Sequence, residues 1–199
     1  IDNAERGFSF MKDGALDMRM DQTQAVTAAS WLKDSKETEI ANALYQYGEE
    51  KRSRIIASTI KEYQKNNDLN STLELANLIA TVVRPGKNKH PATRSFQAIR
   101  IAINDELKKL SEALEQTIDA LSPNGRLAII TFHSIEDRIV KQFIRKYYRP
   151  KQLPKGLPII ANDESECLLK DLGKIKPSDE EIRVNRRSRS AILRLVEKC

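Results

Sequence analysis

The 199-residue chain is predicted to have an α/β fold in one or two domains. Apolar residues recur every three or four positions through residues 22–84, a pattern typical of amphipathic helices. Residues 126–132 (RLAIITF) form a nearly continuous apolar run between turn residues, which indicates a strand buried on both faces, as in a parallel sheet. Because a helical pattern precedes this strand and another follows it, the second part of the chain belongs to the α/β class.

The first part of the chain divides into a loop and a helical module. Residues 1–21 have neither a helical nor an alternating period and are predicted to form an ordered loop. Residues 22–84 contain no proline and a single glycine, Gly48, so we expect three or four helices there. Ser71 and Glu74 have the spacing of a capping box, which would begin the last of these helices.

The second part of the chain contains the longest periodic segment. An uninterrupted apolar stripe through residues 96–121 predicts one long helix. Residues 149–189 are rich in proline and charge and are predicted to be a long excursion with a short strand at 157–160. Residues 190–197 (SAILRLVE) predict a final strand. Two clear strands are too few for a buried parallel sheet, so we expect further strands upstream of Ile1.

The charge distribution favours a polyanionic partner. The formal net charge is +6, yet the chain carries 28 acidic residues, so the positive excess must lie in local clusters. Four arginines fall within residues 183–189, and lysines and arginines recur through residues 138–155. Such clusters are typical of RNA-binding surfaces, although a merely solvated basic surface has the same composition.

The cysteines, histidines and apolar runs indicate a soluble cytoplasmic protein. Cys167, Cys199, His90 and His133 have no zinc-site or disulfide-framework spacing, so we expect no metal and a reducing compartment. No apolar run approaches the ~20 residues of a membrane span, and the N-terminus has no signal-peptide pattern. We therefore expect no membrane partner.

Three segments contain candidate functional residues. The first is the loop RGFSFMKDGALDMRMD, in which Phe8 and Phe10 could stack on a base while Asp17 accepts a hydrogen bond from an exocyclic amine. Arg19 belongs to the same loop. The alternative is that the phenylalanines anchor the loop in the core while the charged pair satisfies local backbone groups.

The other two segments lie beside predicted helix starts. His90 and Arg94 surround the start of the long helix, where a positive helix end suits phosphate or substrate. From the residues alone, a capped helix with a solvated basic face is the favoured alternative. His133 follows the carboxyl end of the 126–132 strand, where open α/β sheets bind ligands. A hydrogen-bonded structural histidine is the alternative there. The chain contains no GxSxG, GxGxxG or P-loop motif.

The segments RGFSF, DGALDMRMD, HPATRSFQAIRIAIN, GRLAIITFHSIEDRIVK and RSRSAILR, in this order, resemble the bacterial 16S rRNA (cytosine-N4) methyltransferase family. The resemblance implies the C-terminal part of a class I (Rossmann-like) S-adenosylmethionine-dependent methyltransferase with an inserted all-helical domain. It divides the chain into an active-site loop (1–21), an inserted domain that recognises rRNA (22–84) and the C-terminal half of the methyltransferase domain (85–199).

The resemblance also implies a reaction and its partners. The family methylates the N4 amine of a cytidine in 16S rRNA, near the decoding centre of the small ribosomal subunit, with S-adenosyl-L-methionine as cofactor. The family's glycine-rich cofactor loop, ribose-binding acid and Ser-Ser-Pro-Gln motif all precede the position of Ile1. We therefore expect an N-terminally truncated chain that contains no cofactor-binding residue, binds S-adenosylmethionine poorly and is inactive alone. A homodimer is a further possibility.

Within this chain, the resemblance favours Asp17 as the catalytic carboxylate beside the target base. The residues expected to bind substrate or RNA are Phe8, Phe10, Arg19, His90, Arg94 and His133. Two alternatives remain: a catalytically inactive rRNA-binding or assembly fragment, and a helical interaction module whose basic clusters only provide solubility. A steep salt dependence of RNA affinity would exclude the second of these.

Overall fold

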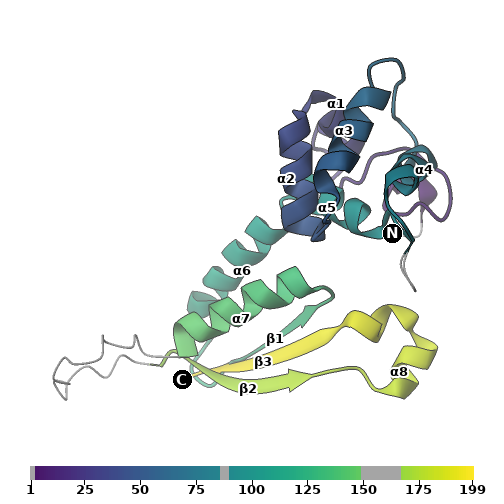
Figure 1. The fold of residues 1–199 in the computed structure, drawn as a ribbon. Coiled ribbons are helices and arrows are strands. Elements are labelled where there is room, and N and C mark those ends of the chain that lie inside the picture. Colours follow the sequence, from purple (N-terminus) through teal and green to yellow (C-terminus); the bar gives the residue numbers. More distant parts are fainter. Residues whose placement is uncertain (1–2, 86–89, 149–166) are drawn as a thin grey trace, which may run out of the picture. The chain divides into compact units, whose positions relative to one another are not determined.

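The computed structural model describes residues 3–85, 90–148 and 167–199 (Figure 1). The chain separates into two compact units, Ile1–Glu106 and Leu107–Cys199. The first unit is helical and the second contains a three-stranded sheet, so the predicted mixed α/β class is confirmed. Among the described residues, no helix is long and apolar enough to cross a membrane. The division into active-site loop, insert and catalytic half stays a prediction.

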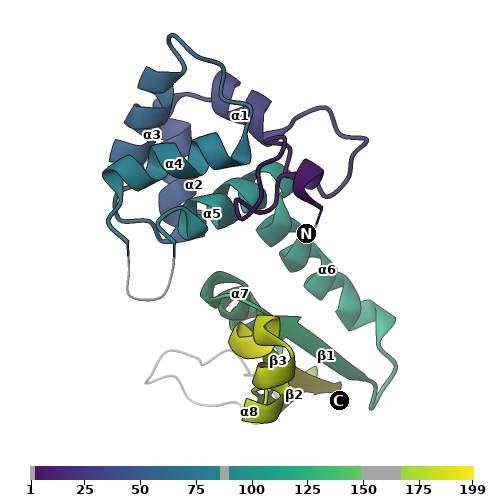
Figure 2. The same cartoon turned by 90° about the vertical axis from the view of Figure 1, so that its right-hand side faces the viewer.

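The first unit consists of an N-terminal loop and a group of helices (Figure 2). Its elements are η1 (Ala4–Arg6), α1 (Ala28–Asp34), α2 (Glu37–Gly48), α3 (Ser53–Tyr63), α4 (Thr72–Val82) and α5 (Thr93–Asn104). The predicted helical module is thereby confirmed, and residues 3–21 form an ordered loop except for the one turn of η1. Apolar side chains from α1 to α5 share one core, which includes the fully buried Leu32, Ile40, Ile56, Leu75 and Ile99.

One of the two hydrogen bonds of the predicted capping box is present at the start of α4. The Ser71 hydroxyl accepts a hydrogen bond from the Glu74 backbone N–H at 3.2 Å, as an N-cap does. The Glu74 carboxylate accepts instead from the Tyr63 hydroxyl, at the end of α3. The side chain expected to close the cap locally therefore links two helices.

The predicted long helix is wrong in one respect, because it is broken at Asp105. This residue adopts the left-handed conformation, with φ of 51°, and separates α5 from α6 (Glu106–Ala120). Arg100 and Glu106 form a bidentate ion pair across the break, with contacts of 2.7 and 2.8 Å. The apolar stripe continues through the break, so hydrophobic periodicity alone could not reveal it.

The residue before the break, Asn104, ties α5 to the N-terminal loop. Its buried amide donates to the carbonyls of Met18 and Arg100, both at 2.8 Å. Its oxygen accepts the Met20 backbone N–H at 2.7 Å. One side chain thus satisfies backbone groups of two segments that are 84 residues apart in sequence.

The second unit contains a sheet of strand order β1-β3-β2. Its elements are α6, β1 (Arg126–Thr131), α7 (Ser134–Tyr148), β2 (Leu169–Ile175), α8 (Asp179–Val184), η2 (Arg186–Ser190) and β3 (Ile192–Lys198). The predicted final strand is confirmed as β3. β2 and α8 were not predicted, because their short polar sequences lie within the proline- and charge-rich excursion. The strand predicted at 157–160 lies outside the described residues.

β1 forms where predicted but differs in its environment. It pairs antiparallel with β3, whereas its apolar run indicated a parallel neighbour. Ile129 packs into a core with helix residues such as Leu114 and Val140. Ile130 and Phe132, which follow on the other side of the strand, are 59% and 53% exposed in this chain. The expected burial of both faces is therefore met on one face only.

A buried ion pair fixes α7 to β3. Arg194 donates to the Asp137 carboxylate through Nε at 2.7 Å and Nη2 at 3.2 Å, and both residues are buried. Lys141 lies 3.3 Å from the same carboxylate. The Arg194 guanidinium, opposed by burial, holds the pKa of Asp137 below its usual value.

The bridging role of Asn104 predicts that Asn104→Ala destabilises the first unit by about 1–3 kcal/mol, because Met18 and Met20 lose their backbone partners. Urea unfolding followed by fluorescence of Trp31, the single tryptophan and a residue of this unit, measures the effect. Asn66→Ala, at an exposed position, is the matched control and should change stability by less than about 0.5 kcal/mol. Equal stabilities of the two variants would contradict the role of the bridge.

The buried ion pair predicts an acid-dependent loss of stability in the second unit. Because the folded pKa of Asp137 is lowered, its stabilisation is present above the ordinary carboxyl pKa of about 3.9 and is lost as the pH falls through the lowered value. Asp137→Asn should lower stability at pH 7 by about 3 kcal/mol, since Arg194 is left buried and unpaired. Asp137→Asn should also make the loss of stability between neutral and acid pH less steep.

Far-UV circular dichroism melts recorded from neutral to acid pH measure this behaviour, while Trp31 fluorescence reports the first unit separately. Asp119→Asn, at an exposed position of α6, is the control. If stability falls equally steeply with decreasing pH in Asp137→Asn and in the unmodified protein, other carboxylates cause the acid-dependent loss.

Candidate functional site

The N-terminal loop is held in place by alternate burial of its residues. Leu16 and Met18 are 2% and 0% exposed and belong to the helical core. The backbone N–H of Leu16 donates to the backbone carbonyl of Asn70 at 2.8 Å, and the N–H of Ala29 donates to the carbonyl of Leu16 at 2.9 Å. Asp17 lies between Leu16 and Met18 in the sequence, and 15% of its side chain is exposed.

Two glycines allow the loop to fold back on itself. Gly7 has φ of 69°, and a Cβ at this position would lie 2.4 Å from the carbonyl oxygen of Ala15. At Gly14, a Cβ would lie 2.0 Å from the carbonyl oxygen of Ala4. Both positions therefore require glycine for the close approach of one part of the loop to the other.

Asp17 and Arg19 form a tight pair within this loop. The Asp17 carboxylate accepts hydrogen bonds from Arg19 Nε at 2.6 Å, from Arg19 Nη2 at 2.8 Å and from the Arg19 backbone N–H at 3.1 Å. Arg19 Nη1 donates to the carbonyls of Gln24 at 2.6 Å and Gln22 at 3.2 Å. The pair thus organises the backbone between residues 17 and 24, which is the structural alternative considered for it.

The ion pair with Arg19 leaves part of the hydrogen-bond acceptor capacity of the Asp17 carboxylate available. A carboxylate has about four acceptor positions, and Arg19 occupies three, so about one stays available for a ligand. The hydrogen bonds from Arg19 outweigh burial and hold the pKa of Asp17 below its usual value. Asp17 is therefore suited to accept a hydrogen bond and poorly suited to take up a proton at neutral pH.

Aromatic rings gather beside the start of α5. The ring of Phe10 lies 4.5 Å from that of His90 with an interplanar angle of 34°, and 4.8 Å from Phe96 in an edge-to-face arrangement. Phe8 is flanked by the guanidinium of Arg6, whose Cζ lies 5.4 Å from the ring centre. The predicted residues Phe10 and His90 are brought together, and Phe96, which the sequence placed only in an apolar stripe, joins them.

Arg6 was not singled out from the sequence, yet it braces the same loop. Its Nη2 donates to the carbonyls of Arg19 at 2.8 Å and Met20 at 3.1 Å. Only its position two residues before Phe8 hinted at a role. Arg94, by contrast, points to the turn after α2, where its Nη1 donates to the Glu49 carbonyl at 3.3 Å.

His133 belongs to the second unit, between β1 and α7. Its Nε2 lies 3.1 Å from a carboxylate oxygen of Glu136, and its Nδ1 accepts the Glu136 backbone N–H at 3.3 Å. The Glu136 carboxylate also accepts the Phe132 N–H at 2.8 Å. Burial raises the pKa of Glu136, but hydrogen bonds from His133 and from Phe132 N–H outweigh it, so the net shift is downward. The sequence places Glu136 beside His133, at the carboxyl end of the same predicted strand.

Gly7 and Gly14 are packed against the loop's own carbonyls. The expectation that no residue of this chain binds S-adenosylmethionine stays a prediction. Within the described part of the chain, no group of three or more His, Cys, Asp or Glu residues could hold a metal ion.

Comparison with known proteins places this loop and fold in a class of methylases. The chain matches the MraW methylase family over residues 1–199 and belongs to that family. The family predicted from the sequence motifs is therefore confirmed.

Individual relatives carry a more specific name, "Ribosomal RNA small subunit methyltransferase H". The chain is 62% identical over 198 residues to the protein of this name from Vesicomyosocius okutanii and 59% identical over 198 residues to that from Ruthia magnifica. It is 53% identical over 203 residues to that from Alcanivorax borkumensis. Each comparison covers 100% of this chain but 64% of the relative, so the chain spans just under two thirds of their length.

The Asp17–Arg19 geometry predicts that Arg19→Gln raises the pKa of Asp17 towards its ordinary value, because the cation and most of its hydrogen bonds are removed. A carboxyl 13C titration by NMR measures this pKa. Faster hydrogen exchange of the Ala28 amide, which donates to the Asp17 carbonyl at 2.7 Å, should accompany the change. Lys12→Gln, in the same loop, is the control. An unshifted Asp17 titration would mean that Arg19 does not set this pKa.

Proposed function

We propose that the complete protein transfers a methyl group from S-adenosylmethionine to the N4 amine of a cytidine in small-subunit (16S) rRNA, near the decoding centre. The proposal rests on the N-terminal loop of a chain that belongs to the MraW methylase family. In this loop Asp17 is paired with Arg19, and Phe10 packs against His90. The relatives' name supports rRNA of the small subunit as the substrate. We place the reaction in the cytoplasm, where the partner is the small ribosomal subunit, and retain a homodimer as a hypothesis.

The sheet of the second unit supports a class I, Rossmann-like catalytic domain. β1 and β2 both pair antiparallel with β3, so they run parallel to each other on its two sides. β1 has one edge without a partner strand among the described residues, and Ile130 and Phe132 are exposed beside it. These features suit a larger, mostly parallel sheet that continues at β1. Residues 22–84 are then an insert in that domain, between the loop 1–21 and the half formed by 85–199.

The residues of the loop can position a flipped base. In this proposal the cytosine stacks against the Phe8 or Phe10 side of the loop, with His90 supporting the Phe10 ring. Its exocyclic amine donates a hydrogen bond to the remaining acceptor position of Asp17. Arg19 keeps that carboxylate ionised and oriented, so it is a positioning residue.

Alignment is the main contribution expected of these residues. The amine is a weak nucleophile because its lone pair is delocalised into the ring, and a hydrogen bond to Asp17 favours the geometry in which the lone pair points at the methyl group. The lowered pKa of Asp17 makes it an acceptor of this hydrogen bond and not the final holder of the proton. When the bond between N4 and the methyl carbon forms, the bond from that carbon to sulfur would break, S-adenosylhomocysteine would leave, and the amine proton would pass to solvent water. S-adenosylmethionine supplies the methyl group. Arg94 and His133 are proposed to contact the RNA backbone or to shape the pocket.

The proposed role of Asp17 predicts that Asp17→Asn in the complete protein lowers methyl transfer to small ribosomal subunits by about 100-fold or more. RNA affinity should change by less than about threefold, because the substitution keeps the side chain's shape and the other proposed RNA contacts stay in place. Single-turnover transfer of a labelled methyl group, with separate RNA-binding measurements, distinguishes the two effects.

Asp34→Asn, at an exposed position of α1, is the control for this experiment. Unchanged turnover in Asp17→Asn would remove Asp17 from the mechanism. Absence of methyl transfer to small subunits by the unmodified complete protein would refute the proposed function itself.

A further inference from the structure

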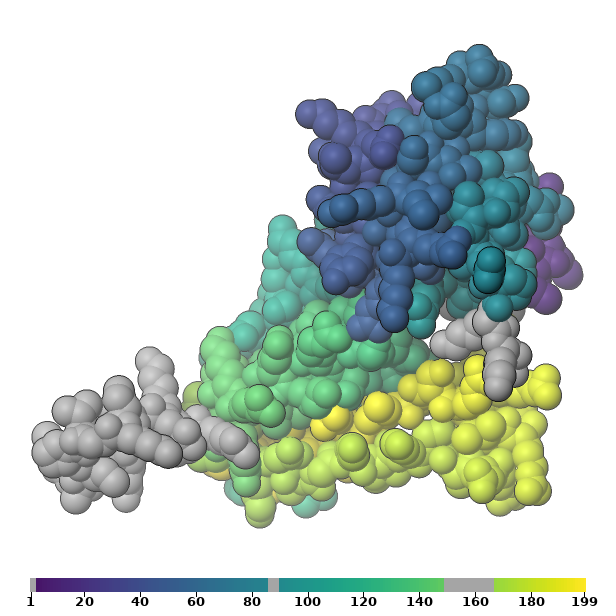
Figure 3. Space-filling view, in the orientation of Figure 1, coloured from purple at the N-terminus to yellow at the C-terminus, as the bar shows by residue number. Residues whose placement is uncertain are grey.

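A groove of about 710 Å³ opens between the end of α2 and the beginning of α3, within the first unit. The two helices lie side by side at the surface of this unit (Figure 3). The volume is within the ~300–1,000 Å³ typical of ligand sites. The residues that line it are Ala41, Asn42, Tyr45, Gln46, Lys51, Arg52, Ser53, Arg54 and Ile55.

The lining of the groove is cationic. It includes Lys51, Arg52 and Arg54 and no carboxylate. In the described part of the chain, Lys51 and Arg54 form no salt bridge. The neighbouring Glu50 is buried, and its carboxylate accepts the Arg52 backbone N–H at 3.0 Å, so its charge is directed inward. An anion in the groove would therefore meet Lys51 and Arg54 without a competing carboxylate in the lining.

The groove also exposes apolar and aromatic surface. Tyr45 is 64% exposed and Ile55 is 51% exposed, although most other apolar residues of α2 and α3 are buried. An aromatic ring beside cations is the combination on which unpaired bases stack while the cations hold the phosphates. Asn42 and Gln46 lie one helical turn apart on α2, and their amides can donate to and accept from base edges.

Hydrogen bonds within the protein preorganise the rim of the groove. Arg52 Nη1 donates to the Val82 carbonyl at the end of α4, at 2.7 Å. The Ser53 N–H donates to the Glu50 carbonyl at 3.2 Å, which tightens the turn between α2 and α3. A preformed rim lowers the entropy lost on binding, so the groove is suited to a specific ligand and not only to diffuse attraction.

We propose that this groove binds a single-stranded segment of RNA, with a base stacked on Tyr45 and adjacent phosphates held by Lys51 and Arg54. This inference rests on the proposed function, because it identifies the bound segment as a part of the rRNA substrate. RNA is favoured over a protein partner because the groove places cations and no lining carboxylate beside an exposed ring, the combination that single-strand binding sites use.

The test uses the complete protein and a fluorescein-labelled, unstructured single-stranded RNA of about 12 nucleotides, a length within the range of single-strand sites. Fluorescence anisotropy at several salt concentrations gives the affinity and its salt slope. Tyr45→Ala should weaken binding by about 5- to 100-fold, whereas Tyr45→Phe, which keeps the ring, should bind nearly as the unmodified protein does. Lys51→Glu with Arg54→Glu should reduce the slope of log affinity against log salt by about 1.4.

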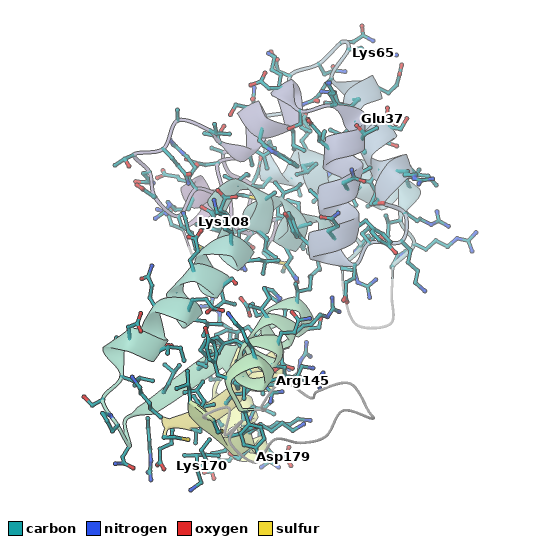
Figure 4. All side chains as sticks on the ribbon, turned by 90° about the vertical axis from the view of Figure 1, so that its left-hand side faces the viewer. Glu37, Lys65, Lys108, Arg145, Lys170 and Asp179 are labelled. Atoms are coloured by element: carbon teal, nitrogen blue, oxygen red, sulfur yellow. The ribbon has the colours of Figure 1, made fainter. Side chains whose placement is uncertain are left out.

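A charge-matched control distinguishes the groove from general electrostatics. Lys33→Glu with Lys65→Glu makes the same change in net charge at exposed positions; Lys65 follows the opposite end of α3 and points into solvent (Figure 4). This control should leave the salt slope unchanged. The proposal is overturned if the groove variants bind as the unmodified protein does, if both charge variants lose affinity equally, or if the unmodified protein binds no single-stranded RNA.

Methyl transfer to small subunits, assayed in parallel, separates this inference from the proposed function. Normal transfer with unaltered RNA binding by the groove variants would overturn the inference and leave the function standing. Loss of RNA binding on groove substitution in a protein that transfers no methyl group would support an RNA groove while the proposed function failed.

Discussion

The hydrogen bonds of Asn104 are the constraint on which the arrangement of the first unit depends. A buried amide must find partners, and this one finds them on the loop backbone at Met18 and Met20 and on its own helix at Arg100. Because Asp105 then turns into the left-handed conformation, α5 ends where the loop is attached. The loop that carries the candidate site is thus held by a core helix and not by its own side chains alone.

Attachment of the loop to the core determines what its polar residues can do. Leu16 and Met18 are buried in the core, and Arg19 takes most of the acceptor capacity of the intervening Asp17 and keeps its carboxylate ionised. The structural and functional interpretations of this pair are therefore compatible. The same contacts that order the loop also prepare a charged hydrogen-bond acceptor with little freedom to move, which is what alignment of a weak nucleophile requires.

Charge is used differently in the two units. In the second unit, Asp137 and Arg194 are buried together and join a helix to a strand. In the groove of the first unit, Lys51 and Arg54 are exposed and unpaired among the described residues, beside an exposed ring. Composition reports only the sum of such charges, so the net charge of +6 could suggest RNA but could not say which cations are available to it.

Periodicity and motifs in the sequence determined the mixed α/β class, the helical module, β1 and β3, and the family, because these depend on local patterns and on long matching segments. Tertiary structure alone decided the break at Asp105, the formation of β2 and the Phe10–His90 contact. The break between α5 and α6 lies next to Asn104, which hydrogen-bonds to the backbone of Met18 and Met20. β2 forms by pairing with β3. These contacts join segments far apart in sequence, so no local pattern encodes them.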